Sequence, residues 1–165
     1  MSIETILDSI SQYDCPLVEI TGGEPLLQKN LNPLISELIE KGYQVLIETN
    51  GSMPVKKLPG GCIKIIDIKC PSSNESDSFL IENLDYIHEN DEIKFVIADR
   101  RDYDFSRSCI LKNLTFMPAD KIHLSPVFGR ISPETIAEWL LKDNIRARLS
   151  LQQHKIIWDP EKRGV

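Results

Sequence analysis

Apolar residues along this chain recur with two different periods, which predict helices and strands in alternation. Helical spacing, with apolar residues at i, i+3, i+4 and i+7, is clear near the start of the chain and weak over residues 79–89. Short apolar runs between the helical stretches are typical of buried strands. The predicted helices span residues 3–13, 30–41, 79–89, 102–114 and 133–143, and the predicted strands 17–21, 44–48, 63–68, 92–98, 121–125 and 146–151.

This alternation predicts an α/β fold with a largely parallel sheet. Six strands are too few to close an eight-stranded barrel, so an open or partial barrel is expected. A helix packed ahead of the first strand further suggests that an earlier strand is missing. Because there is no low-complexity linker and no internal repeat, residues 1–165 are expected to form a single domain.

Composition narrows the class of protein without naming a ligand. The chain is 41% hydrophobic and 27% charged, as globular domains are, and its net charge of −6 argues against a nucleic-acid-binding surface. No apolar run approaches the roughly 18 residues that span a membrane, and the first residues show no signal-peptide pattern. The four cysteines are scattered, which fits a reducing compartment, so a cytoplasmic location is expected.

The first predicted strand ends in Thr-Gly-Gly-Glu-Pro, residues 21–25. Two glycines at a strand end let the backbone turn sharply and approach a ligand without a Cβ in the way. Glu24 sets a carboxylate at this edge, and Pro25 fixes the exit of the chain and removes a backbone donor. Taken alone, the motif is also compatible with an ordinary strand-to-helix turn.

Other polar stretches follow the carboxyl ends of other predicted strands. Ligands collect outside these ends in parallel α/β folds. A single composite site is therefore expected from the strand ends at residues 21–25, 48–52, 67–73 and 125–128.

Five stretches together carry a family resemblance: the Gly-Gly-Glu-Pro turn and residues 47–52, 67–73, 124–127 and 152–158. In this order they closely resemble 7-carboxy-7-deazaguanine synthase, a family of radical S-adenosylmethionine (SAM) enzymes in queuosine biosynthesis. The resemblance runs from about residue 17 to residue 165. It implies a partial, open TIM-like barrel of the radical SAM type, lacking its first strand.

The resemblance also implies roles for individual residues. Thr21 matches a substrate-contacting threonine, and Val165 matches a chain end that can bind substrate. Other interpretations stay open, since Ser52 could serve only its turn, Lys69 could only pair with Asp67, and the tail could be a solvated, frayed end. No catalytic or metal-binding residue is assigned. Positions matching the SAM pocket of the family are Gly22, Gly23, Glu24, Glu48, Ser52, Asp67, Ile68, Lys69, Ser125 and Val127.

One departure from the family concerns its 4Fe–4S cluster. The family holds this cluster in a CxxxCxxC loop, whereas the cysteines here are Cys15, Cys62, Cys70 and Cys109, too far apart for that motif. The Mg²⁺ ligand, next to that loop in the family, has no match either. We interpret the cysteines as structural or incidental thiols, and His123, inside a predicted strand, as a packed core histidine. The sequence thus looks like the synthase without its N-terminal unit.

Two functional hypotheses follow. The resemblance implies a homodimeric enzyme that converts 6-carboxy-5,6,7,8-tetrahydropterin to 7-carboxy-7-deazaguanine with loss of ammonia. Its cofactors in the family are SAM, a 4Fe–4S cluster and Mg²⁺. The alternative is an inactive truncated homologue that keeps part of the SAM site, either an interaction or regulatory protein or a mis-started fragment. A SAM-dependent methyltransferase is disfavoured because no GxGxxG loop is present. Without the cluster motif, this chain alone is predicted to be inactive.

Overall fold

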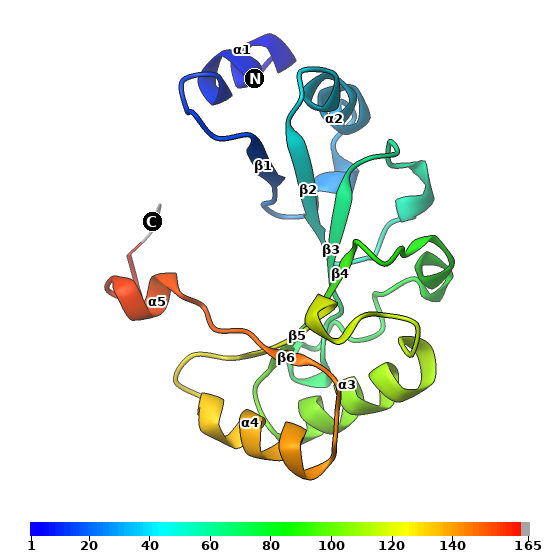
Figure 1. Ribbon diagram of the computed structural model, residues 1–165, viewed down its shortest axis with the longest axis vertical. Helices are drawn as coiled ribbons and strands as arrows, with labels where there is room; N and C mark the ends of the chain where they lie inside the picture. Colours follow the sequence, from blue (N-terminus) through cyan, green and yellow to red (C-terminus); the bar gives the residue numbers. More distant parts are fainter. Residues whose placement is uncertain (163–165) are drawn as a thin grey trace.

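A single parallel sheet of six strands forms the frame of the molecule (Figure 1). The computed structural model describes residues 1–162. Each strand pairs in parallel with the next along the chain, so the sheet order is the sequence order. The sheet curves into an open arc, which confirms the predicted α/β open barrel. The strands are β1 (Leu17–Ile20), β2 (Gln44–Thr49), β3 (Ile63–Asp67), β4 (Glu92–Ile97), β5 (Ile122–Pro126) and β6 (Arg148–Leu149).

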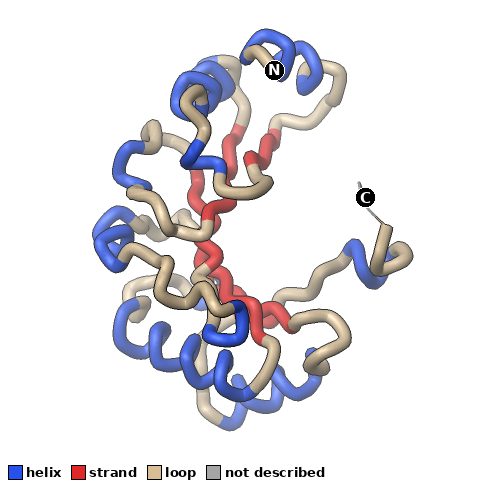
Figure 2. The backbone as a smooth tube through the Cα atoms, turned by 180° about the vertical axis from the view of Figure 1, so that it is seen from behind, coloured by secondary structure: helices blue, strands red, loops and turns tan. Residues whose placement is uncertain are grey.

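Helices that connect the strands lie on the outer, convex side of this arc (Figure 2). Ser132 caps α4 by accepting a hydrogen bond from the Thr135 N–H, with Pro133 in the first turn, as its sequence predicts. The α-helices are α1 (Ile3–Ile10), α2 (Leu31–Glu40), α3 (Arg100–Asn113), α4 (Pro133–Lys142) and α5 (His154–Ile157). Short 3₁₀ helices are η1 (Pro25–Leu27), η2 (Val55–Lys57), η3 (Pro71–Ser73), η4 (Ile81–Tyr86) and η5 (Ala119–Lys121).

Alternate strand residues face the helices and form the hydrophobic core. Burying each such side chain contributes about 1.5–3 kcal/mol, and the core residues that carry this contribution include Ile47, Ile66, Phe95 and Leu124, all fully buried. The alternate positions, such as Glu48 and Lys94, face the inner side of the arc and are partly exposed. The strand pattern therefore sorts the sheet into an apolar outer face and an inner face rich in charge.

Two predicted elements differ from the structure. Residues 79–89 form only the 3₁₀ helix η4, because Asn83 is buried and uses its side chain elsewhere. Its amide donates to the carbonyls of Gly51 and Met53 and accepts from the Val55 N–H, at 2.9–3.0 Å. These bonds reach 28–32 residues back along the chain and hold the segment against the loop after β2 in place of a regular helix. The last strand is also shorter than predicted, and the tail after it contains the unpredicted helix α5.

Among the described residues, no helix is both long and apolar enough to cross a membrane.

Candidate functional site

The Gly-Gly-Glu-Pro turn is held in place by the Glu24 carboxylate. Oε1 accepts hydrogen bonds from the Leu26 N–H at 3.0 Å and the Thr49 hydroxyl at 2.8 Å, and Oε2 accepts one from the Asn50 N–H at 2.9 Å. These bonds cap η1 and tie the turn to the end of β2. A carboxylate offers about four acceptor positions, so Glu24 retains capacity for one donor from a ligand.

The two glycines of the turn differ in what they contribute. Gly22 has a φ of +115°, which a residue with a side chain would adopt only under strain. Gly23 has no such φ, yet an added Cβ would meet no atom within 4 Å. It would instead project into the open space that Gly23 lines. The structure thus leaves room for a ligand to approach the Gly23 backbone closely.

Polar residues from three strand ends line one pocket of about 260 Å³. An adjoining pocket of about 710 Å³, between α1 and the start of α2, shares Thr21, Gly22 and Gly23 and includes Glu24. The structure therefore brings together most of the site residues expected from the sequence. The smaller pocket is lined by Thr21, Gly22, Gly23, Glu48, Thr49, Asn50, Asp67 and Lys69.

Glu48 lies at the centre of a hydrogen-bonded chain on the inner face of the sheet. Its Oε2 accepts from the Thr21 hydroxyl at 3.2 Å, and its Oε1 lies 2.8 Å from the Lys94 ammonium. Burial alone would raise the pKa of Glu48, but the hydrogen bond and charge of Lys94, with the Thr21 hydrogen bond, lower it below its usual value. Burial alone would lower the pKa of Lys94, but the hydrogen bond and charge of Glu48 raise it above its usual value.

Asp67 offers an acceptor that the protein itself does not use. The residue is 8% exposed, and its Oδ2 lies 2.7 Å from the Lys69 ammonium. Its Oδ1 is buried and has no hydrogen-bond partner among the described residues. Because buried acceptors are nearly always satisfied, this oxygen fits a hydroxyl or ammonium group of a bound ligand.

The segment after Asp67 is supported from behind by Asp102 of α3, which is fully buried. Its carboxylate accepts hydrogen bonds from the Ser72 N–H at 2.9 Å, the Ser72 hydroxyl at 2.5 Å and the Ala98 N–H at 2.9 Å. These bonds join η3 to the end of β4. The loop that carries Lys69 is therefore fixed by a polar contact in the core.

Four expected site residues do not line these pockets. The Ser52 N–H donates to Asn50 Oδ1 at 2.9 Å, so its backbone serves the turn. Ile68 packs in the hydrophobic core, Ser125 is buried in β5, and the Val127 N–H donates to the Ile97 carbonyl at 2.8 Å. The predicted contact of Val165 lies outside the described residues.

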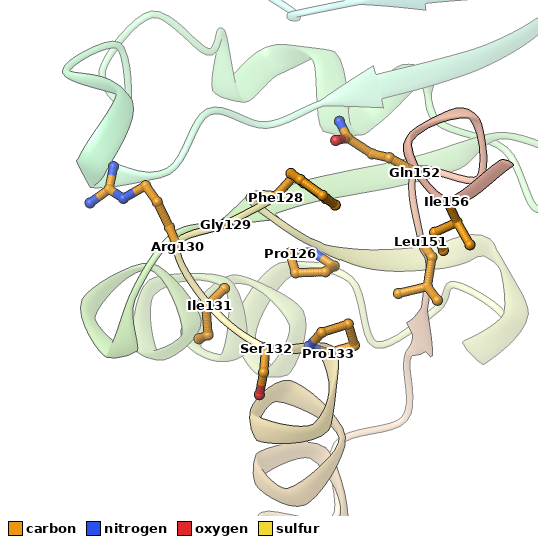
Figure 3. A pocket seen from close by; sticks show the side chains of 10 residues that line it. All are labelled: Pro126, Phe128, Gly129, Arg130, Ile131, Ser132, Pro133, Leu151, Gln152 and Ile156. Carbon is orange, nitrogen blue, oxygen red and sulfur yellow. The ribbon is translucent and has the colours of Figure 1, made fainter. Parts of the chain in front are cut away.

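A separate, apolar pocket of about 410 Å³ lies beyond the ends of β5 and β6 (Figure 3). Phe128 stands on one side of it, and Leu151 and Ile156 of the tail stand on the other. The Lys155 ammonium lies 5.4 Å from the centre of the Phe128 ring, within the range of a cation–π contact. The pocket thus joins two stretches that the sequence resemblance singles out, residues 124–127 and 152–158, at their margins.

The cysteines present do not fit an iron–sulfur cluster. No group of three or more potential ligands that could hold a metal ion occurs within residues 1–162. Cys62 and Cys70 are buried, Cys15 is exposed, and burial raises the pKa of the Cys70 thiol, as do the charges of Asp102 and Asp67. Burial thus disfavours, in Cys70, the thiolate form that a cluster requires.

Sequence reasoning missed the charged residues on the inner face. Lys94 contacts Glu48, and Glu19, two residues before Thr21, faces the same side. The His123 side chain is 12% exposed, so it is packed as expected, but it lies on the inner face, with Nε2 3.1 Å from Glu92 Oε2. The alternation of buried and partly exposed residues in β4 and β5 could have identified Lys94 and His123, because it places them on the face of the sheet opposite to Phe95 and Leu124.

The structure is that of an α/β protein with a candidate ligand site at the carboxyl ends of an open parallel sheet. A 7-carboxy-7-deazaguanine synthase of Koribacter versatilis is 45% identical over 162 residues, which cover 90% of this chain and 72% of that protein. A second, of Chlorobaculum tepidum, is 39% identical and covers all of this chain and 76% of its own length. The chain belongs to the 7-carboxy-7-deazaguanine synthase family, which confirms the resemblance found in the sequence.

Solved structures agree on the fold. QueE from Escherichia coli matches with a TM-score of 0.66 and 26% identity over 92% of this chain and 64% of that one, so this chain spans just under two thirds of it. Streptococcus suis SuiB, solved bound to S-adenosylmethionine, matches with a TM-score of 0.57 over 90% of this chain and 40% of that one. At 15% identity, SuiB supports the fold alone. No family model matches.

Proposed function

We propose that this chain forms the SAM- and substrate-binding part of a 7-carboxy-7-deazaguanine synthase. The reaction converts 6-carboxy-5,6,7,8-tetrahydropterin to 7-carboxy-7-deazaguanine with loss of ammonia, as a radical SAM carbon–nitrogen lyase in queuosine biosynthesis. The observation that carries the proposal is the convergence of Thr21, Gly23, Glu48 and Asp67 on one pocket, in a chain of this family. Family membership favours this enzyme over the alternative, a truncated homologue acting as an interaction or regulatory protein.

The charge of the site supports a cationic cofactor. The smaller pocket is lined by the carboxylates of Glu48 and Asp67 and by the ammonium of Lys69, a net charge of −1 when all are ionised, and the Glu24 carboxylate lies beside it, bonded to Asn50. SAM carries a sulfonium and an ammonium group, which such a site attracts. When bound, SAM supplies the radical chemistry of the superfamily.

Each residue then has a distinct task in holding SAM. The Gly23 backbone approaches the methionine end, and the remaining acceptor position of Glu24 takes its ammonium group. Asp67 Oδ1 accepts a hydroxyl or ammonium proton. Ser125, Val127 and the Phe128 pocket lie beside the adenosine. Ser52 and Ile68 contribute backbone at the rim, and Thr21 contacts the substrate, with Val165 as a second contact.

The 4Fe–4S cluster and Mg²⁺ of the family are not assigned to residues of this sequence, because its cysteines do not fit them. We therefore expect that residues 1–165 by themselves yield no 5′-deoxyadenosine from SAM under strong reductant, measured by liquid chromatography. Formation of 5′-deoxyadenosine above a no-protein control would contradict this expectation. A homodimer in the cytoplasm, as in the family, completes the proposal.

Isothermal titration calorimetry with SAM tests the proposed function directly. A folded protein should bind SAM with one site per chain and should bind S-adenosylhomocysteine more weakly, because that ligand lacks the sulfonium charge. Fluorescence titration with 6-carboxypterin, a stable oxidised analogue of the substrate, tests the second ligand. If a protein with a cooperative melting transition binds neither SAM nor 6-carboxypterin, the proposed function is wrong.

A further inference from the structure

Lys94 of β4 lies on the inner face of the sheet, where it is the ion-pair partner of Glu48. Its ammonium lies 2.8 Å from Glu48 Oε1, and in the sheet register Lys94 stands directly opposite Asp67 of β3. Its side chain is 30% exposed, so it is shielded from water without being sealed off. It therefore contacts the site through Glu48 rather than by lining the pocket itself.

The Thr21 hydroxyl completes a chain of three groups. A hydroxyl has one proton to donate and two lone pairs that accept. An ionised carboxylate can only accept, so the Thr21 proton is committed to Glu48 Oε2, 3.2 Å away. The free lone pairs of Thr21 then face the pocket that this residue lines. A ligand group placed there must be a donor.

We propose that Lys94 is a positioning residue that keeps Glu48 ionised and thereby fixes Thr21 as a hydrogen-bond acceptor for an N–H group of the substrate. The inference rests on the proposed function, in which Thr21 contacts a pterin rich in N–H donors. The inference adds which partner donates in the hydrogen bond between Thr21 and the substrate, and it names Lys94 as the residue that determines this direction. Without the Lys94 charge, Glu48 gains a proton more readily and can donate to Thr21, which reverses the bond.

The charges around Glu48 explain why a cation is needed at this place. Glu19 on β1 faces Glu48, and each disfavours ionisation of the other, while burial also raises the pKa of Glu19. Asp67 on β3 adds negative charge near Lys94, and Lys69 after β3 is held by Asp67 at 2.7 Å. Lys94 on β4 is the residue that both hydrogen-bonds Glu48 and counters these carboxylates. Its removal therefore leaves the Glu48 side chain, which is 26% exposed, beside like charges and without its hydrogen-bonded cation.

The test compares ligand binding and the ionisation of Glu48 in matched variants of the whole chain. Wild type, Lys94→Met, Lys94→Arg, Glu48→Gln and Lys94→Met/Glu48→Gln are titrated with 6-carboxypterin and with SAM from pH 5 to pH 8. The ¹³C carboxyl signal of Glu48, assigned by its loss in Glu48→Gln, reports its ionisation without any ligand. Thermal melting checks that each variant folds.

We expect Lys94→Met to weaken 6-carboxypterin binding about tenfold at pH 7 and to move its acid limb to higher pH. Lys94→Arg keeps the charge and should bind within about threefold of wild type. In the Glu48→Gln background, Lys94→Met should have little further effect, because the two residues act through one bond. SAM binding should change less than 6-carboxypterin binding.

Each contrary result has a definite meaning. If Lys94→Met melts normally and binds 6-carboxypterin as wild type does, the positioning role is wrong while the proposed function stands. The same holds if Lys94→Met weakens 6-carboxypterin binding equally at every pH and equally in the Glu48→Gln background. An unchanged titration of the Glu48 carboxyl signal in Lys94→Met overturns it as well. If wild type binds neither ligand, the proposed function itself fails. If Lys94→Met does not fold, Lys94→Arg decides, since loss of binding there with normal melting contradicts a role of charge.

Discussion

The two pockets at the carboxyl ends of the strands are built in opposite ways. The polar pocket takes its lining from the ends of β1, β2 and β3, and hydrogen bonds between the first two of these ends hold Thr21, Glu48, Thr49 and Asn50 in place. The apolar pocket takes its lining from the β5–α4 connection and the tail, and its walls are mostly proline, phenylalanine, leucine and isoleucine. Hydrogen bonds are directional, whereas apolar contact is not. The first pocket can therefore select a ligand by chemistry, and the second mainly adds buried area.

The largest effect should come from filling the polar pocket at Gly23. The Gly23→Val variant places a branched side chain in the space where a Cβ now meets no protein atom within 4 Å. We expect SAM affinity to fall at least about 100-fold with the melting temperature nearly unchanged, measured by calorimetry and thermal melting.

Gly60→Val is the matched control. An added Cβ at Gly60 also meets no atom within 4 Å, and Gly60 lines neither the polar pocket nor the larger pocket adjoining it. It should bind SAM as wild type does. If both variants bind SAM normally, the polar pocket is not the SAM site.

The next effect is on stability, behind the polar pocket. Asp102→Asn replaces a buried carboxylate that accepts three hydrogen bonds with an amide that has one acceptor oxygen. We expect the free energy of unfolding to fall by about 2–3 kcal/mol, measured by urea unfolding. The apolar pocket has no comparable buried polar support.

Asp104→Asn, two residues further along α3, is the control, because the Asp104 side chain is 52% exposed. Its paired charge lies at the surface and should contribute less than about 1 kcal/mol. Equal losses in the two variants would show that the Asp102 network adds no special stability.

How far each pocket could be predicted follows from how it is built. The polar pocket needs only strand ends and short turns, so the motif around Gly23 and the parallel-strand rule were enough to bring Thr21, Glu48 and Asp67 together. Lys94 was missed because a lone lysine in a strand reads as surface until the pairing of β2, β3 and β4 is known. The register, unlike the motif, depends on tertiary packing.

The apolar pocket was harder to predict because one of its walls is formed by the C-terminal segment after β6, including Leu151 and Ile156. The sequence of residues 146–151 reads as a full strand, yet only Arg148 and Leu149 pair with β5. Leu151 leaves the sheet to face Phe128, and α5 follows without a side-chain cap to signal its start. The short 3₁₀ helix η4 was mistaken for an α-helix for a related reason, since Asn83 bonds to residues far away in sequence.

A smaller effect should separate the ligand halves that the two pockets hold. Phe128→Ala removes an aromatic wall of the apolar pocket and the cation–π contact of Lys155. We expect affinity for 5′-methylthioadenosine to fall about five- to tenfold, with methionine binding unchanged, measured by calorimetry. Phe116→Ala, at a ring that is 53% exposed elsewhere on the surface, should change neither. Loss of methionine binding in Phe128→Ala would place both ligand halves in one pocket.

The smallest effect is a difference in acid sensitivity between the strands beneath the two pockets. Burial lowers the pKa of His123 on β5; the charge of Glu92 opposes this shift, and that of Arg148 adds to it. The folded protein therefore favours the neutral imidazole. Because the pKa of His123 is lower in the folded than in the unfolded protein, the neutral imidazole contributes stability at pH values above the ordinary pKa of 6.5. This contribution is lost as the pH falls through the folded pKa. Glu48 beneath the polar pocket also has a lowered pKa, but its window lies below 4.5.

Melting temperatures from pH 8 to pH 4 should therefore fall in two steps, the first from His123. His123→Gln should remove the step below pH 6.5, worth less than about 1 kcal/mol, and leave the step below pH 4.5 in place. His88→Gln is the control, because His88 is exposed. If His123→Gln and wild type lose stability in parallel between pH 6.5 and pH 4.5, His123 is not held neutral by the fold, and the acid response of the β5 side has another origin.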